Sequence, residues 1–251
     1  MIGKELRALY PISWLSESTT FVEFVNELLS RDDAYLLVGD FASGEHDRVP
    51  SFFTEVLPKF IASKLIENAT SRIYCIDLHS LRLDSLLGKL EETNLLSQVR
   101  VVQAKLETMD KHAFLRPSMI DYLENHQDEL IWLDDFLIGE KRFPPGCFDI
   151  GIFNNDIIGY LHEYYKESSD FNKGLQTVHR LMKKEGLLVV ANPCSLYVVD
   201  NVAILENNRF KFIEGIDIDL STSTVSYFES TVEPNRLSRL NHYTFMLFRA
   251  D

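Results

Sequence analysis

An apolar run that ends in a turn of small residues constrains the fold of this chain more than any other feature. Residues 35–46 read Tyr-Leu-Leu-Val-Gly-Asp-Phe-Ala-Ser-Gly-Glu-His, so a β-forming segment leads into Asp40, Ala42 and Gly44. Small residues in such a turn let backbone N–H groups approach a ligand closely. A second apolar run, residues 73–76, ends in Asp77, where a nucleotide-binding sheet places an acid for ribose hydroxyls. Together the two turns predict a pocket for an adenosyl ligand.

Each turn also has a plainer interpretation. A dinucleotide fingerprint contains three glycines, whereas residues 40–46 contain one, so this segment by itself fits an ordinary strand-to-loop turn equally well. Asp77 by itself fits a surface acid or an acid near a helix N-terminus. The order of the remaining elements is what favours the pocket.

Strand-like and helical segments alternate along the chain. We expect strands over residues 36–38, 73–76, 99–103, 148–153, 187–191, 210–220 and 243–248, and helices over residues 18–31, 51–68, 81–96, 119–130, 157–165, 171–184 and 198–205. Lys183 and Lys184 are expected in the last turn of their helix, with Gly186 ending it. Such alternation predicts a mostly parallel sheet with helices on both faces and with ligands at the carboxyl ends of its strands.

The length of 251 residues favours a single domain, because it suffices for one full hydrophobic core. Residues 1–33 precede the first strand, and we expect them to form a helical extension. Residues 107–146 interrupt the alternation with a polar, charged stretch. We interpret this stretch as an insertion between the third and fourth strands that could act as a lid.

Charge and composition argue against several classes of partner. The chain has 38 acidic and 25 basic residues and a formal net charge of −13, which argues against a nucleic-acid partner. The absence of a long apolar run and of a signal peptide predicts a cytoplasmic protein that does not cross a membrane. Cys75, Cys147 and Cys194 lack disulfide or zinc spacing, and the histidines lack a metal-binding pattern, so no metal is expected.

With these elements in order, four segments resemble the class I S-adenosylmethionine-dependent methyltransferases, a Rossmann-like family. Residues 40–44 resemble its glycine-rich first motif, and residues 76–78 resemble the acidic end of its second strand. Residues 148–155 resemble its fourth strand with a polar tip, and residues 181–190 resemble its Arg-x-Leu-Lys-Pro-Gly-Gly segment. The resemblance implies an α/β, doubly wound, mostly parallel seven-stranded sheet with an antiparallel last strand, and S-adenosylmethionine as the cofactor.

The resemblance also implies which residues bind the cofactor, and all of them follow or end a predicted strand: Asp40, Ala42, Gly44, Asp77, Leu78, Leu106 and Asn154. The residues of the first turn would face the methionine part, and the acid after the second strand would accept hydrogen bonds from both ribose hydroxyls. The two leucines would enclose the adenine, with plain core packing as an equal alternative. The asparagine would line the floor beside the sulfonium.

The methyl acceptor, a small molecule or a protein, is expected near four residues that follow the fourth strand: Asn155, Asp156, Tyr160 and His162. His162 has a side chain suited to general-base catalysis, although most such histidines are surface or packing residues. Asp156 could orient an amine or hydroxyl, or cap a helix. Methyl transfer from a sulfonium is a direct displacement that depends on alignment, so no catalytic residue is assigned.

Three residues depart from the family pattern. Ala42 and His46 stand where glycines are usual, and Lys105 follows the third strand, where the family often has an aspartate near the adenine. These departures keep open a second hypothesis, a methyltransferase-like protein that binds partners without catalysis. A nicotinamide-dependent oxidoreductase ranks last, because 33 residues separate Gly44 from Asp77. A last strand that runs antiparallel between its neighbours would separate the first two hypotheses from the third.

Overall fold

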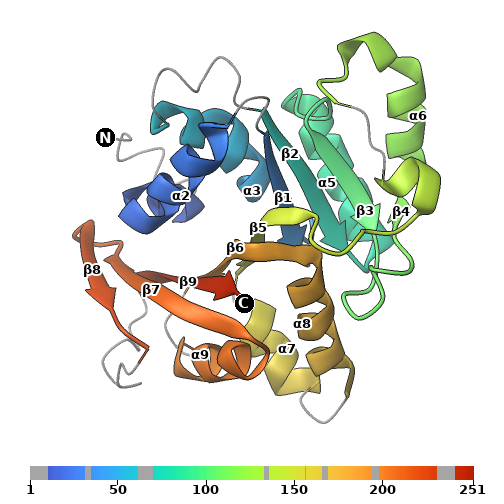
Figure 1. Cartoon of the computed structure of the whole chain (residues 1–251). Helices are drawn as coiled ribbons and strands as arrows, with labels where there is room; N and C mark the ends of the chain where they lie inside the picture. The colour runs from blue at the N-terminus through green and yellow to red at the C-terminus, as the bar shows by residue number, and fades with distance from the viewer. Residues whose placement is uncertain are drawn as a thin grey trace.

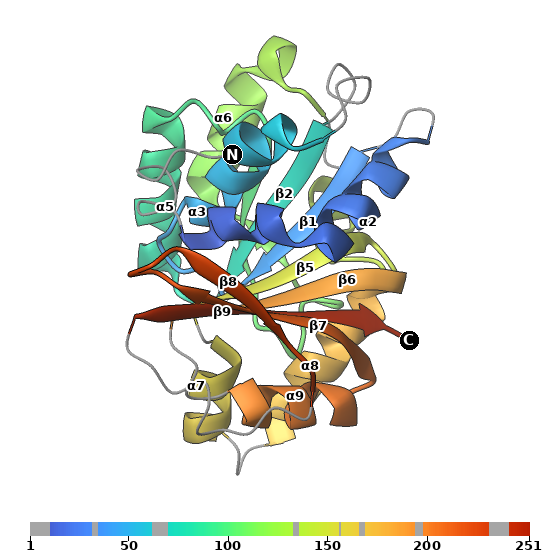
Figure 2. The same cartoon turned by 90° about the vertical axis from the view of Figure 1, so that its left-hand side faces the viewer.

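The computed structural model describes residues 11–31, 35–61, 70–132, 136–155, 157–165, 169–193, 198–230 and 241–251. These residues form one twisted sheet with helices packed against it (Figure 1). Figure 2 shows α2 (Thr19–Leu29) and α3 (Arg48–Ser51) on one side of the sheet, and α7 (Ile157–Tyr165), α8 (Ser169–Leu181) and α9 (Val198–Asn207) on the other. The expectation of an α/β fold with helices on both faces is confirmed.

The described residues contribute nine strands to one sheet, in the spatial order β4-β3-β2-β1-β5-β6-β9-β7-β8. The strands are β1 Tyr35–Phe41, β2 Thr70–Asp77, β3 Val99–Gln103, β4 Phe114–Leu115, β5 Phe148–Asn154, β6 Met182–Asn192, β7 Phe210–Asp219, β8 Thr224–Phe228 and β9 His242–Ala250. Strands β3, β2, β1, β5 and β6 run parallel to one another. Every residue of β5 is buried, as expected for a strand covered on both faces.

The last strand runs antiparallel between two others. β9 pairs antiparallel with β6 on one side, where Met246 lies opposite Val190, and with β7 on the other. The seven strands from β3 to β7 therefore have the expected directions, mostly parallel with the last strand antiparallel. The expected total of seven is too low, because the short β4 and β8 each add an antiparallel strand at an edge. The antiparallel insertion counts against the oxidoreductase hypothesis, since dinucleotide-binding sheets of that class are parallel.

The remaining helical segments are short, apart from α5 (Ser80–Glu92), which joins β2 to β3 and buries four leucines. They are α6 Pro117–Asn125, the 3-10 turns η1 Pro11–Glu17, η3 Leu57–Lys59 and η4 Gln127–Glu129, and the π turns η2 Phe52–Val56 and η5 Phe136–Glu140. The helix expected over residues 51–68 is instead α3 followed by η2 and η3, as far as Ile61. None of the helices in the described ranges is both long and apolar enough to span a membrane.

The predicted end of the helix over residues 171–184 is wrong. α8 ends at Leu181, and the two lysines belong to β6. The Nζ of Lys183 donates to Oδ1 of the buried Asp149 at 2.8 Å. The positive charge of Lys183 is therefore paired with a carboxylate on β5 and not with the end of a helix. Gly186 does not end the helix either. A Cβ at this glycine would lie 2.8 Å from the carbonyl oxygen of Lys183, so close backbone packing explains the glycine.

The insertion over residues 107–146 is attached to the sheet by a buried arginine. Arg100 in β3 is fully buried, and its Nη2 donates to the carbonyl of Trp132 at 2.7 Å. Its guanidinium carbon lies 3.9 Å from the centroid of the Trp132 ring, a cation–π contact. Tyr74 in β2 packs edge-on against Trp132 and Phe143. These contacts place the described part of the insertion against β2 and β3.

Candidate functional site

A cavity of about 540 Å³ lies where β2 and β3 end, at the carboxyl edge of the parallel strands. Its wall comes from the segments after β1, β2, β3 and β5 and from α5, α7 and α8. Six of the predicted site residues line it: Ala42, Asp77, Leu78, Leu106, Asn155 and Tyr160. Four do not: Asp40, Gly44, Asn154 and His162. Asp156 lies outside the described residues, so its role stays a prediction.

The turn after β1 is a compact loop held against β2. Ala42 and Gly44 both have positive φ, 56° and 64°, a backbone conformation that glycine adopts freely and alanine does not. The N–H of Ser43 donates to the carbonyl of Ile76 at 3.1 Å, and the N–H of Gly44 donates to Oδ2 of Asp77 at 3.0 Å. The two turns singled out in the sequence are therefore in direct contact. Ala42 lines the cavity, whereas Gly44 is not among the lining residues.

Asp77 is the buried acid on the cavity wall. Only 6% of its surface is exposed, and its Oδ1 accepts a hydrogen bond from the N–H of His79 at 2.8 Å, while its Oδ2 accepts the one from Gly44. A carboxylate oxygen has two lone pairs, so each oxygen can accept one further hydrogen bond from a ligand. Asp77 thus holds the two turns together and presents an acceptor to the cavity.

Apolar side chains form the walls on either side of Asp77. Leu78 follows β2 and is 46% exposed, and Leu106 follows β3 and is partly buried against the core. On the other side, Ile157 and Leu161 from α7 and Phe171 from α8 line the same cavity. Leu78 and Leu106 therefore lie where a flat apolar group could pack between the strand ends and these helices.

A second acid lies close to this site. Asp40 in β1 is almost fully buried, and its Oδ1 has no hydrogen-bond partner in the described structure. Burial, and to a smaller extent the charge of Asp77, raise the pKa of Asp40 well above its ordinary value. A buried carboxyl oxygen without a partner is costly, so it marks a place where a donor is missing.

Asn154 at the end of β5 is buried and already has partners. Its Oδ1 accepts hydrogen bonds from the hydroxyl of Tyr243 at 2.9 Å and from the N–H of Asn155 at 3.0 Å. Burial raises the pKa of Tyr243, so this hydroxyl keeps its proton as the donor. Asn155 has a positive φ of 62° and itself lines the cavity. The floor expected from Asn154 is therefore a hydrogen-bonded pair one layer below the cavity surface.

The predicted acceptor residues on α7 divide into two groups. Tyr160 lines the cavity and is 52% exposed, and its ring packs 4.6 Å from that of Tyr164. His162 does not line the cavity, and its ring lies 5.8 Å from that of Phe171. The geometry of His162 is that of a packing residue.

The departures from the family pattern leave the cavity open. His46 is not among the lining residues, and burial lowers its pKa, as do Arg48 and Lys89. Lys105 lines the cavity as an exposed side chain at the end of β3. Sequence reasoning missed Arg82 and Gly174, which belong to α5 and α8. The only signal for these two was that their helices follow strands whose ends form the site.

The sequence matches no model of a known protein family. A comparison with curated proteins also finds no match.

Several solved structures resemble this chain in the path of the backbone. An S-adenosylmethionine-dependent methyltransferase from Aquifex aeolicus has a TM-score of 0.49 and 12% identity, with 100% of both chains covered. The carbon methyltransferase CurJ has a TM-score of 0.48 and 10% identity, over 88% of this chain and 50% of that chain. A precorrin-6y C5,15-methyltransferase from Geobacter metallireducens has a TM-score of 0.40 and 13% identity, over 92% of this chain and 88% of that chain.

The sheet of this chain has the one feature that the family resemblance in its sequence implied, a last strand that runs antiparallel between its neighbours.

Proposed function

We propose that the protein is an S-adenosylmethionine-dependent methyltransferase that acts on a small-molecule or protein acceptor. The observation that supports this most is the cavity at the ends of β2 and β3, which combines the buried acceptor Asp77 with apolar walls. It occurs in a sheet whose last strand is antiparallel between its neighbours, at the edge where parallel strands collect ligands.

The lining suits the adenosine part of such a cofactor. Asp77 would accept hydrogen bonds from two vicinal ribose hydroxyls, for which a carboxylate is well matched. Leu78 and Leu106 would contact the faces of the base and remove apolar surface from water. Lys105 stands beside the base position and would donate rather than accept there.

The methionine part would extend toward the turn after β1. Ala42, which has a positive φ, lines the cavity at this turn. The partnerless Oδ1 of Asp40 is buried and does not line the cavity, so Asp40 would support the turn from within the sheet. Gly44 would act indirectly, because its N–H already holds Asp77. Asn154 would support the floor through its bond with Tyr243.

The cofactor supplies an electrophilic methyl group on a sulfonium. The chain's own contribution to a direct displacement is to align the acceptor and to exclude water. Asn155 and Tyr160 line the cavity and are the described residues placed to orient an acceptor, and Asp156 stays a proposed third. No general base is assigned, since His162 packs outside the cavity.

Calorimetry with S-adenosylmethionine and S-adenosylhomocysteine tests this proposal. Both ligands are expected to bind, and Leu78→Ser should weaken binding by about fivefold, because half of a leucine's burial contributes about 1 kcal/mol. Ile138→Ser is the matched control, since Ile138 is 60% exposed and lies outside the cavity. A folded protein that binds neither ligand at millimolar concentration would contradict the proposal.

A second candidate is a methyltransferase-like protein that binds a partner without catalysis. It is favoured by Lys105 on the cavity wall and by Ala42, which has a positive φ at a position where a glycine would be unstrained. Stable co-purification with a partner, together with no heat from either ligand, would support this candidate. Release of S-adenosylhomocysteine in the presence of an acceptor would rule it out.

A further inference from the structure

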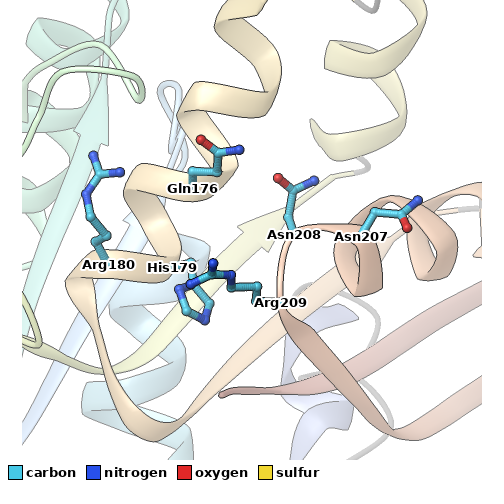
Figure 3. Close-up of a pocket in the computed structure, with 6 residues that line it drawn as sticks. All are labelled: Gln176, His179, Arg180, Asn207, Asn208 and Arg209. Carbon is cyan, nitrogen blue, oxygen red and sulfur yellow. The ribbon is translucent and has the colours of Figure 1, made fainter.

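A second pocket, of about 310 Å³, lies near the amino-terminal ends of β6 and β7, whereas the cavity lies at the carboxyl ends of the parallel strands. Figure 3 shows the residues that line this second pocket. It is formed where α8 ends before β6 and where the turn after α9 leads into β7, so it adjoins the amino-terminal ends of these strands. Its lining residues are all polar: Gln176, His179, Arg180, Asn207, Asn208 and Arg209.

The pocket concentrates basic and amide groups without an acid among its lining residues. Two arginines and one histidine line it, in a chain whose formal net charge is −13. The other three lining residues are amides: Gln176 and Asn207 can donate through their NH₂ groups, whereas the NH₂ of Asn208 already donates to the carbonyl of Ile204 at 2.9 Å and to Oδ1 of Asn172 at 3.4 Å. Such a set of donors suits a ligand with several acceptor oxygens and a negative charge.

Arg209 is the central basic group. Its guanidinium lies beside the ring of His179, whereas the side chain of Arg180 extends away from this pair (Figure 3). Among the described residues, no ion pair engages the Arg209 guanidinium. The Nη2 of Arg180, in contrast, donates to Oδ2 of Asp110 at 2.7 Å and to the hydroxyl of Thr177 at 2.9 Å.

His179 points to an unmet interaction at the same place. Its Nε2 is buried and has no hydrogen-bond partner in the described structure. Burial lowers the pKa of His179, and the charge of Arg209 lowers it further, whereas hydrogen bonding to the backbone of Asp251 and Arg209 and the charge of Asp251 act in the opposite sense. The basic groups are therefore close enough to disfavour each other's charge, and a bound anion would offset that cost.

The turn that carries Arg209 is held in place by backbone bonds. The N–H of Arg209 donates to the carbonyl of Glu206 at 3.1 Å, and the N–H of Asp251 donates to the carbonyl of Arg209 at 3.3 Å. Arg209 has a positive φ of 68°, which is uncommon for a side chain of this size. The side chain is thus directed to the pocket by an ordered turn.

We propose that this pocket binds the phosphate group of a small molecule. Arg209 would hold two phosphate oxygens as a bidentate pair, the ring N–H of His179 would donate to a third, and Gln176 and Asn207 would donate from the rim. Arg180 already pairs with Asp110 and would not contact the phosphate. The site is separate from the proposed cofactor cavity, which α8 lines with its earlier residues, Asp170 to Leu175.

Thermal unfolding and calorimetry at constant ionic strength, set with sodium chloride, test the site. Inorganic phosphate and glycerol 3-phosphate are the two probes, because the first represents free phosphate and the second a phosphorylated metabolite. A saturable rise in melting temperature is expected with at least one of them. The absence of a saturable rise with both probes would overturn the proposal.

Matched variants locate the binding. Arg209→Gln should weaken phosphate binding by about tenfold or more, because it removes a charge-assisted contact. Arg249→Gln is the control, since the Arg249 guanidinium pairs with Glu185 at 3.3 Å outside the pocket. Gln176→Ala, on the exposed side of α8, is a second loss variant if Arg209→Gln folds poorly. Equal phosphate affinity in the control and the loss variants would overturn the site.

The same variants separate this proposal from the proposed methyltransferase function. Affinity for S-adenosylhomocysteine should be unchanged in Arg209→Gln, because Arg209 does not line the cofactor cavity. Phosphate binding without cofactor binding would contradict only the methyltransferase, and the reverse result would contradict only the phosphate site.

Discussion

Replacing Asp77 with alanine should unfold the protein more readily, in addition to weakening any cofactor binding. The two oxygens of this buried carboxylate accept backbone hydrogen bonds from Gly44 at 3.0 Å and from His79 at 2.8 Å. A hydrogen bond to a charged group contributes about 1.5–3 kcal/mol, so the loss of two should lower the free energy of unfolding by about 3–6 kcal/mol. Asp77→Asn keeps one acceptor oxygen and should lose about half as much.

Urea unfolding followed by circular dichroism measures this difference. With a slope of about 3 kcal/mol per molar urea, Asp77→Ala should lower the midpoint by about 1 M or more. Asp84→Ala is the control on the neighbouring helix, because Asp84 is exposed and its pair with Arg116 should contribute less than about 1 kcal/mol. Equal midpoints for the two alanine variants would refute the view that Asp77 holds the turns after β1 and β2 together.

Three further predictions concern the same structure. Ala42 has a φ of 56°, a conformation that costs a non-glycine residue about 1–2 kcal/mol. Glycine also gives the unfolded chain more freedom, so Ala42→Gly should raise the free energy of unfolding by up to about 1 kcal/mol. A lower urea midpoint in Ala42→Gly would contradict this prediction. Burial raises the pKa of Asp40 in the folded state, so the folded chain keeps a proton that the unfolded chain releases, and stability falls as pH rises above about 4. In Asp40→Asn the melting temperature should fall less steeply as pH rises. An unchanged dependence of the melting temperature on pH would contradict the role given to Asp40. Gly186→Ala places a Cβ 2.8 Å from the Lys183 carbonyl and should lower the free energy of unfolding by about 1–3 kcal/mol, whereas Gly88→Ala, with open space around it, should not.

The elements that could be predicted from the sequence are those with strong local periodicity. β3 and α7 have the expected bounds. In each case the apolar pattern that predicts the element begins and ends within the element itself. The antiparallel last strand was expected from the family resemblance. The edge strands β4 and β8 were missed, because each is short and has little local pattern of its own.

Errors arose where a distant contact decided a boundary. Lys183 and Lys184 have the composition of a helix end, but β6 begins at Met182 because Lys183 pairs with Asp149 on the neighbouring strand. Gly186 likewise has the composition of a helix stop, although its role is to let two backbone segments approach each other. Asp149 on β5 is the distant neighbour in both cases, because its Oδ1 pairs with Lys183 and its carbonyl oxygen would lie 3.1 Å from a Cβ at Gly186, so no local rule could have found these contacts.

The amino-acid order alone determined that small residues follow the first strand and that an acid ends the second, because both are properties of single segments. Tertiary structure decided which side chains face the cavity. It placed Ala42 and Asp77 on the wall and buried Asp40 outside the lining, since burial depends on how strands pack beside one another. It also brought the end of α8 to the turn at Arg209, a pocket whose two halves pack together only in the folded chain.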